Sequence, residues 1–210
     1  MSGPEPLAAA GFAATINVSR ETIERLERYA ALLIKWNKTV NLVGRSTIAD
    51  LWRRHMLDSA QLFPYLPKSA GRLVDFGSGA GFPGLVLAIM GAPDVHLVEA
   101  NARKCAFLRE AARVTETAVT IHNARIETPT ALKADVVTAR ALAPLSILLE
   151  YAEPYLTPNS ICLFLKGTGV DEELTEIQKM WNIRENTYPS LSNPDGVIVR
   201  LEVLSHDSAG

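Results

Sequence analysis

The feature that most constrains the fold is a glycine-rich turn between an apolar segment and a helix-forming segment. Residues 72–76 form a short apolar run, which predicts a buried strand. Glycines follow at positions 77, 79 and 81, and residues 83–90 are predicted to form a helix. Glycine suits this turn because the backbone needs positive φ and a ligand must approach it closely. Strand, glycine turn and helix in this order indicate a nucleotide-binding α/β fold.

Two acidic residues strengthen this indication. Asp75 precedes Gly77 by two positions, and Glu99 ends the next apolar run, about 20 residues further on. A carboxylate at the position of Glu99 can bind the hydroxyl groups of a ribose. A tight turn without any ligand is the alternative, but carboxylates at two successive strand ends argue against it. The sequence therefore predicts a site for a nucleoside-containing cofactor.

The charge beside the turn distinguishes between cofactors. A dinucleotide would place its pyrophosphate at the N-terminus of the following helix. Asp75 would repel that phosphate, and Pro83 removes one N–H donor. S-adenosylmethionine has a ribose but no phosphate, and it carries cationic amino and sulfonium groups. We therefore expect S-adenosylmethionine rather than a nicotinamide or flavin dinucleotide.

The whole chain is predicted to be an α/β domain preceded by a small helical module. Residues 1–15, rich in Ala, Pro and Gly, are expected to form a flexible tail, and residues 16–68 the helical module. In residues 69–210 strands alternate with helices, which predicts a mostly parallel sheet. The turn at residues 193–196 predicts a C-terminal antiparallel hairpin. This plan is that of the class I S-adenosylmethionine-dependent methyltransferase (Rossmann-like) fold, so residues 69–210 are predicted to be the methyltransferase domain.

Individual elements follow from the same patterns. Strands are predicted at residues 72–76, 95–98, 118–122, 135–139, 161–165, 185–188 and 197–204. Helices are predicted after the N-cap Ser19, from Ser46 or Thr47 toward Phe63, and over residues 83–90, 102–114, 145–155 and 171–181.

Composition excludes several classes of protein. The formal net charge of −2 gives no overall nucleic-acid signature, so RNA binding would have to rest on local charge. Cys105 and Cys162 are far apart and lie in apolar runs, as reduced core cysteines of a cytosolic protein do. The four histidines form no metal-binding pattern, and no apolar run approaches the ~20 residues of a membrane span. We expect a cytoplasmic monomer without a metal or a membrane anchor.

Further motifs narrow the family. Beside the glycine turn the chain contains Arg54-His55-x-x-Asp58-Ser59, Lys104-x-x-Phe107-Leu108, Asn123-Ala-Arg-Ile-Glu127, Arg140-Ala-x-Ala143 and Leu165-Lys166-Gly167. Together these motifs resemble the glucose-inhibited division protein B family, the guanine-N7 methyltransferases of bacterial small-subunit ribosomal RNA. The resemblance extends from Trp36 to Lys166. Val43 and Ala139 depart from it where hydroxyl residues are expected, which affects substrate detail more than reaction type.

The motifs and the resemblance together imply a set of cofactor-binding residues, which are Asp75, Gly77, Gly79, Phe82, Glu99, Ile126, Glu127 and Arg140. Core packing is an equal alternative for Ile126. Arg140 ends a predicted strand and is expected to hold either the methionine carboxylate or an RNA phosphate. A salt bridge with Glu150 or Asp75 is its structural alternative.

Local positive charge indicates where RNA would bind. Between residues 35 and 54 the basic side chains outnumber the single acid, Asp50, and two tryptophans are interleaved with them. Such a segment can engage phosphates and stack on an unpaired base, although Trp36 and Trp52 can equally belong to the core. The expected RNA-binding residues are Lys35, Arg54, His55 and Lys166.

The predicted acceptor determines the chemistry. Guanine N7 has a lone pair and no proton, so no catalytic acid or base is predicted, and the main task is alignment. The expected partner is small-subunit ribosomal RNA or a ribosomal particle. Two alternatives remain open, which are a methyltransferase of a small molecule or protein and a non-catalytic ribosome assembly factor.

Overall fold

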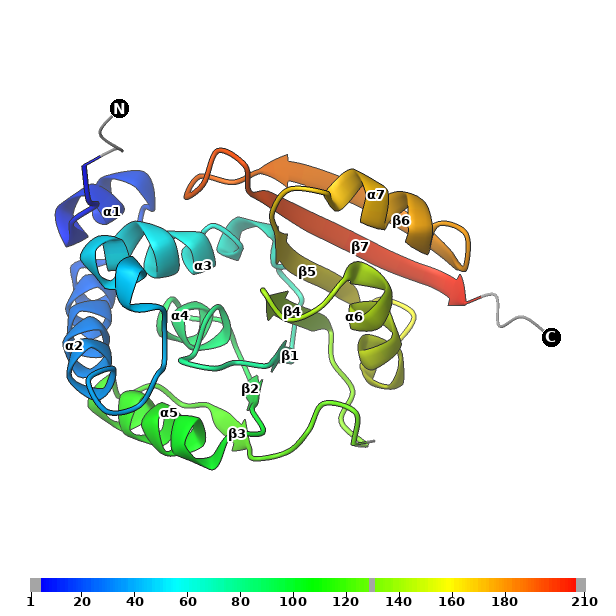
Figure 1. Cartoon of the computed structure of the whole chain (residues 1–210). Helices are drawn as coiled ribbons and strands as arrows, with labels where there is room; N and C mark the ends of the chain where they lie inside the picture. Colours follow the sequence, from blue (N-terminus) through cyan, green and yellow to red (C-terminus); the bar gives the residue numbers. More distant parts are fainter. Residues whose placement is uncertain (1–4, 129–130, 207–210) are drawn as a thin grey trace.

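One mixed seven-stranded sheet forms the centre of the molecule (Figure 1). The computed structural model describes residues 5–128 and 131–206. The sheet order is β3-β2-β1-β4-β5-β7-β6; β1 to β5 pair in parallel, and β7 runs antiparallel to β5 and β6. The strands are β1 Leu73–Phe76, β2 Val95–Val98, β3 Thr120–His122, β4 Val136–Arg140, β5 Ile161–Lys166, β6 Trp181–Pro189 and β7 Val197–His206.

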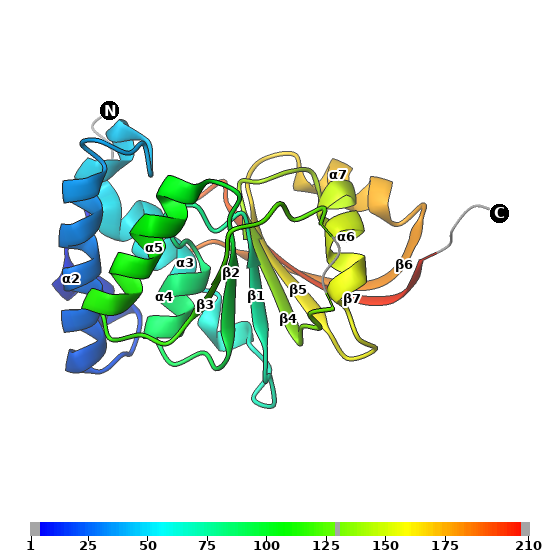
Figure 2. The ribbon, with the colours of Figure 1, turned by 90° about the horizontal axis from the view of Figure 1, so that it is seen from below.

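Helices cover both faces of this sheet (Figure 2). One face carries α4 and α5, with α2 packed outside them, and the other carries α6 and α7. The helices are α1 Ala9–Thr15, α2 Arg20–Trp36, η1 Arg45–Asp50, η2 Trp52–Leu57, α3 Asp58–Ala60, η3 Phe63–Tyr65, α4 Gly84–Ile89, α5 Ala102–Val114, α6 Leu145–Ala152, η4 Glu153–Tyr155 and α7 Val170–Ile177. The parallel sheet with its terminal hairpin confirms the predicted fold class.

Two hydrophobic cores hold these layers together. Strands β1, β2 and β4 are almost wholly buried, so their side chains enter the core on both faces. The first core joins α1, α2 and η2 to α4, α5 and the sheet. The second joins the other face of the sheet to α6 and α7. Helix α2 starts where the sequence predicts, because the Ser19 side chain accepts a hydrogen bond from the Thr22 N–H at 3.1 Å.

Three local predictions are wrong. Residues 9–15 form helix α1 instead of a flexible tail, because Phe12 is buried and packs on Trp52 with ring centres 5.4 Å apart. The helix expected from Ser46 toward Phe63 divides into η1, the π-helical turn η2, and α3. The helix expected over 171–181 ends at Ile177, and Trp181 begins β6 because its side chain enters the second core.

Replacing Phe12 tests the docking of α1. We expect Phe12→Ala to lower the free energy of unfolding by about 3–5 kcal/mol, because a fully buried aromatic side chain is removed and a cavity remains. Urea denaturation measures the loss. The control Ile34→Ala, at a side chain 43% exposed, should change stability by less than about 0.5 kcal/mol. An unchanged stability of Phe12→Ala would mean that α1 is not docked.

Candidate active site

The candidate site lies at the carboxyl ends of the parallel strands, where the strand order reverses. β1 lies between β2 and β4, and the chain moves outward from β1 to β3 before it returns to β4. In open α/β sheets, ligands bind in the crevice at such a point. The glycine loop, residues 77–82, follows β1 there, and Arg140 is the last residue of β4.

The glycine loop has the backbone geometry that its sequence predicts. The φ angle is 60° at Gly77, 59° at Gly79 and 99° at Gly81, a region that residues with a Cβ rarely adopt. Glu99 holds the loop, because its Oε2 accepts a hydrogen bond from the Gly79 N–H at 2.8 Å. Its Oε1 accepts one from the Asn101 N–H at 2.7 Å. The carboxylate that the sequence predicts to bind ribose therefore lies directly beside the loop.

Asp75 supports the loop from inside the sheet. It is fully buried, and its Oδ1 accepts a hydrogen bond from the Thr138 hydroxyl at 2.7 Å. Gly84 packs so closely that a Cβ there would lie 2.8 Å from Oδ2. Burial raises the pKa of this carboxyl to about 6, although the hydrogen bond from Thr138 and the charge of Arg140 oppose the rise. The Asp75 carboxyl therefore lies beneath the glycine loop, packed against Gly84, and does not reach solvent.

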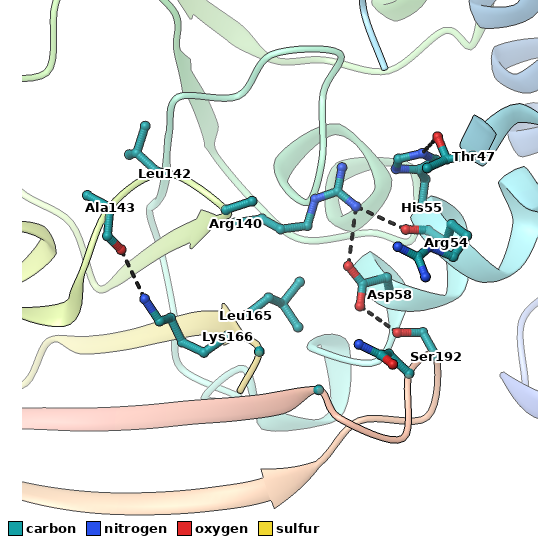
Figure 3. Close-up of a pocket in the computed structure, with 14 residues that line it drawn as sticks. Thr47, Arg54, His55, Asp58, Arg140, Leu142, Ala143, Leu165, Lys166 and Ser192 are labelled. Carbon is teal, nitrogen blue, oxygen red and sulfur yellow. Dashed lines mark hydrogen bonds and ion pairs between the residues drawn. The ribbon is translucent and has the colours of Figure 1, made fainter. Parts of the chain in front are cut away.

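A pocket of about 560 Å³ adjoins the loop, between the N-terminal helices and the sheet (Figure 3). It brings together Arg54, His55, Arg140 and Lys166, which the sequence predicts as site residues. Leu142 connects it to the glycine loop, since a Cβ at Gly77 would lie 2.8 Å from the Leu142 Cδ1. The other lining residues are Thr47, Asp58, Ala141, Ala143, Leu165, Gly167, Ser192, Asn193 and Gly196.

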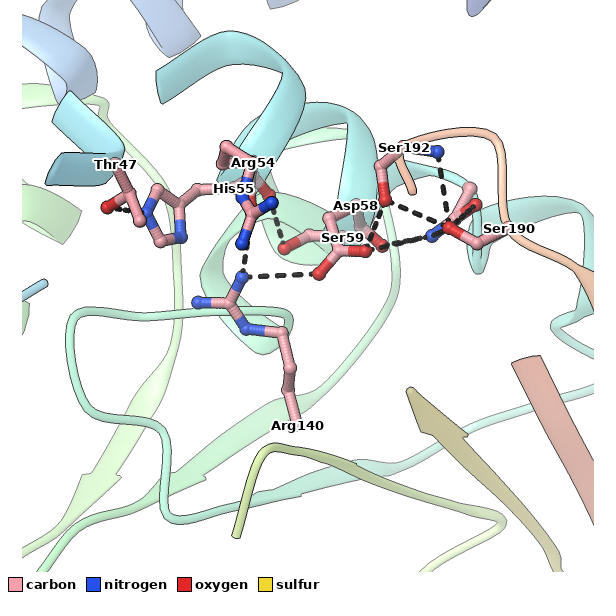
Figure 4. Close-up of polar contacts among 9 residues, drawn as sticks. Thr47, Arg54, His55, Asp58, Ser59, Arg140, Ser190 and Ser192 are labelled. Atoms are coloured by element: carbon pink, nitrogen blue, oxygen red, sulfur yellow. Dashed lines mark hydrogen bonds and ion pairs between the residues drawn. The ribbon is translucent and has the colours of Figure 1, made fainter. Parts of the chain in front are cut away.

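Arg140 joins the sheet to the N-terminal helices inside this pocket (Figure 4). Its Nη1 donates hydrogen bonds to Asp58 Oδ2 at 3.2 Å and to the Arg54 carbonyl oxygen at 3.1 Å. Its guanidinium carbon lies 5.0 Å from the centre of the Phe82 ring, which is a cation–π contact. The guanidinium is thus held from three directions.

Asp58 belongs to one of the family motifs, but no role in the site was predicted for it. The salt-bridge alternatives for Arg140, Glu150 and Asp75, are both wrong, because its ion-pair partner is Asp58. Asp58 Oδ1 also accepts a hydrogen bond from the Ser192 hydroxyl at 2.5 Å. The available signal was the spacing of four positions from Arg54, which places both residues on one helix face. No local signal pointed to Ser192.

His55 is a neutral imidazole stacked on the glycine loop. Its ring centre lies 4.9 Å from that of Phe82, and the two planes differ by 23°. Burial, together with the charges of Arg140 and Arg54, lowers the pKa of His55 to about 3. The ring therefore carries no charge at neutral pH.

The hydrogen bonds of Thr47 assign the tautomer of His55. The Thr47 hydroxyl donates to the Gly44 carbonyl oxygen at 2.7 Å, so its proton is already used. It must then accept from His55 Nε2, which lies 2.7 Å away and carries the ring proton. Nδ1 remains a buried acceptor that has no hydrogen-bond partner within the described ranges 5–128 and 131–206.

Lys166 enters the pocket from β5 but is already engaged. Its Nζ lies 2.8 Å from Glu173 Oε2 and donates a hydrogen bond to the Ala143 carbonyl oxygen at 3.0 Å. The ammonium group therefore fixes the chain after β4, and its predicted RNA contact stays a prediction.

Lys35 lies outside this pocket. It borders a separate groove between α2 and α5, together with Trp36 and Arg109. Trp36 packs edge-on against Phe107 with ring centres 5.6 Å apart, and Trp52 packs on Phe12. Both indoles contact the first core, which favours the packing alternative over base stacking.

Ile126 and Glu127 follow β3 on the side of the second core. Ile126 packs partly buried against that core, and the Tyr155 hydroxyl donates to its carbonyl oxygen at 3.5 Å. The Tyr151 hydroxyl lies 3.4 Å from Glu127 Oε1. The core-packing alternative for Ile126 is thus observed, and the predicted cofactor contacts of both residues stay predictions.

The raised pKa of Asp75 predicts how Asp75→Asn changes stability with pH. The folded protein holds the proton up to about pH 6, whereas the unfolded chain releases it near its ordinary value of about 3.9. The neutral carboxyl therefore stabilises the folded protein fully below about pH 4. As the pH rises to about 6, the free energy of unfolding falls by about 3 kcal/mol. Asparagine does not ionise, so the melting temperature of Asp75→Asn relative to the unchanged protein should rise from pH 4 to 7. A constant difference would contradict the assignment.

Solved structures of distant methyltransferases share this architecture. A ribosomal protein L11 methylase from Lactobacillus delbrueckii subsp. bulgaricus is 14% identical and superposes with a TM-score of 0.55 over 72% of this chain and 77% of that chain. A TehB-like SAM-dependent methyltransferase from Corynebacterium glutamicum is 12% identical and superposes with a TM-score of 0.51 over 71% of this chain and 88% of that chain. At these identities the likeness shows the fold alone.

Sequence comparison is more specific. The model of the family described as rRNA small subunit methyltransferase G (GidB) matches residues 22–197. A protein named ribosomal RNA small subunit methyltransferase G from Paramagnetospirillum magneticum is 59% identical over 207 residues, 99% of this chain and 98% of that protein. A protein of the same name from Rhodospirillum rubrum is 55% identical over 190 residues, which are 90% of this chain and 94% of that protein. These findings confirm the resemblance predicted from the motifs, and the chain belongs to the rRNA small subunit methyltransferase G family.

Proposed function

We propose that this protein transfers a methyl group from S-adenosylmethionine to N7 of a guanine in small-subunit ribosomal RNA. Membership of a methyltransferase family supports the reaction type and the cofactor. The observation that carries the proposal is the position of Leu142. This side chain lines the pocket that holds Arg54 and Arg140, and it also packs against Gly77 of the glycine loop. A cofactor on the loop and a base in the pocket would meet there.

The residues present fit S-adenosylmethionine. When bound, this cofactor supplies an electrophilic methyl group on a sulfonium sulfur. The open backbone at Gly79, where a Cβ would meet only the Gly77 carbonyl oxygen at 3.6 Å, lets a ligand approach closely. Glu99 offers a carboxylate beside it for ribose hydroxyls. In our proposal Phe82, Ile126, Glu127 and Arg140 complete this cofactor site, and the buried Asp75 acts on it only through the loop.

The pocket suits a guanine presented by RNA. Arg54 is exposed at its rim and can neutralise a phosphate. The Asp58 carboxylate in the pocket wall is an acceptor, and the Watson–Crick edge of guanine presents N–H donors that need acceptors. Because N7 has no proton to remove, the site needs orientation rather than a base, which agrees with a histidine held in one neutral tautomer.

The described parts of the chain, residues 5–128 and 131–206, lack two structural features. They contain no helix that is both long and apolar enough to cross a membrane. No group of three or more potential metal ligands occurs among them. We propose a cytoplasmic enzyme that acts as a monomer on ribosomal RNA or on a ribosomal particle, without a metal.

Transfer of labelled methyl to small-subunit RNA or particles from cells lacking the enzyme tests the proposal. We expect incorporation that maps to an N7-methylated guanine. Tight cofactor binding without incorporation would favour a small-molecule or protein substrate. Absence of cofactor binding would contradict the assignment of the glycine loop.

Salt dependence tests the role of Arg54. If Arg54 neutralises an RNA phosphate, Arg54→Ala should reduce the slope of log K against log salt concentration by about 0.7 and weaken binding to different sequences alike. Filter binding or fluorescence anisotropy over a salt series measures this. Lys179→Ala is the control, since Lys179 follows α7, outside the pocket. Equal slopes for the two variants would mean that Arg54 does not neutralise an RNA phosphate.

A further inference from the structure

Tyr29 connects helix α2 to the apex of the glycine loop. The side chain is fully buried, and its hydroxyl donates a hydrogen bond to the Ala80 carbonyl oxygen, 51 residues later in the chain. Burial raises the pKa of this phenol well above its usual value, so the hydroxyl keeps its proton and remains a donor at neutral pH. Nothing in the proposed reaction uses Tyr29 directly.

The ring of Tyr29 also supports the aromatic residue of the loop. Its centre lies 5.4 Å from that of Phe82 and 6.2 Å from that of Phe107. Phe82 is the ring that His55 stacks on at 4.9 Å and that the Arg140 guanidinium faces at 5.0 Å. Tyr29 thus contacts the loop residue that orients two side chains of the pocket.

Close approach of Tyr29 explains the glycine at position 81. A Cβ there would lie 2.9 Å from the Tyr29 hydroxyl oxygen and 2.8 Å from the Leu85 Cβ. The loop therefore packs against α2 at a distance that only glycine permits.

A loop with three glycines loses much conformational entropy when it is ordered. Side chains hold its apex at two points, since Glu99 accepts from the Gly79 N–H and Tyr29 donates to the Ala80 carbonyl oxygen. Ordering the loop before the ligand arrives lowers the cost of binding. An anchor supplied by α2 makes the N-terminal helices part of the cofactor site.

We propose that Tyr29 is a positioning residue that preorganises the glycine loop for S-adenosylmethionine. This inference rests on the proposed function, in which that loop binds the cofactor. Tyr29→Phe keeps the ring and removes only the hydroxyl, so we expect the dissociation constant for S-adenosylmethionine, measured by calorimetry, to rise about tenfold. KM for the cofactor should rise similarly, while kcat changes little.

A matched control separates positioning from general stability. The hydroxyl of buried Thr115 donates to the Ala111 carbonyl oxygen at 2.8 Å at the end of α5. Thr115→Val should lower the melting temperature without changing cofactor affinity. Equal affinities of Tyr29→Phe and the unchanged protein would overturn the proposal.

Hydrogen exchange supplies a test on the unchanged protein. Without cofactor, the Gly79 and Gly81 amides should already be protected, and in Tyr29→Phe they should exchange faster, unlike in Thr115→Val. Fast exchange in the cofactor-free unchanged protein would contradict preorganisation even if Tyr29→Phe failed to fold. Failure of the unchanged protein to bind S-adenosylmethionine would instead contradict the proposed function.

Discussion

The ion pair between Arg140 and Asp58 is the interaction on which the rest of the pocket depends. It connects residues 82 positions apart, and their side chains are only 18% and 19% exposed. Charges withdrawn from water in this way are tolerated when further hydrogen bonds satisfy them. The Arg54 carbonyl oxygen and the Ser192 hydroxyl do so here. Because Asp58 belongs to the N-terminal helices and Arg140 to the sheet, the pair ties together the two walls of the pocket.

The sheet explains where the site is, and the side chains explain what it does. Reversal of strand order beside β1 brings the glycine loop and the end of β4 together in any fold of this class. Such a fold hosts many reactions, so specificity has to come from particular residues. Phe82 is a shared contact in this pocket, since His55 from the π-helical turn η2 stacks on its ring and Arg140 from β4 faces it. A widened helical turn of this kind is often found at functional sites.

Local patterns allowed much of the fold to be predicted from sequence. β2 and α5 have the predicted bounds. An apolar run determines the strand, and a capped segment with helical periodicity determines the helix, and both signals are local in the sequence. Contacts between distant segments were not predictable in this way. The partner of Arg140 depended on how α3 packs against the sheet, and Lys35 shared a basic run with Arg54 but lies in another groove. The turn that carries Ser192 reaches the pocket only because β7 pairs with β5.

The protonation states of the site agree with a reaction that moves no proton. In the proposed methyl transfer one positive charge passes from the sulfur of the donor to the ring of the acceptor, so the total charge in the site does not change. Stabilising such a reaction requires fixed dipoles and exact alignment rather than a proton path. His55 meets this need, because its lowered pKa keeps the ring neutral and Thr47 holds one tautomer. A protonated His55 would add a cation beside Arg54 and Arg140 and would repel a base that becomes positively charged, so burial of this imidazole would favour the proposed reaction.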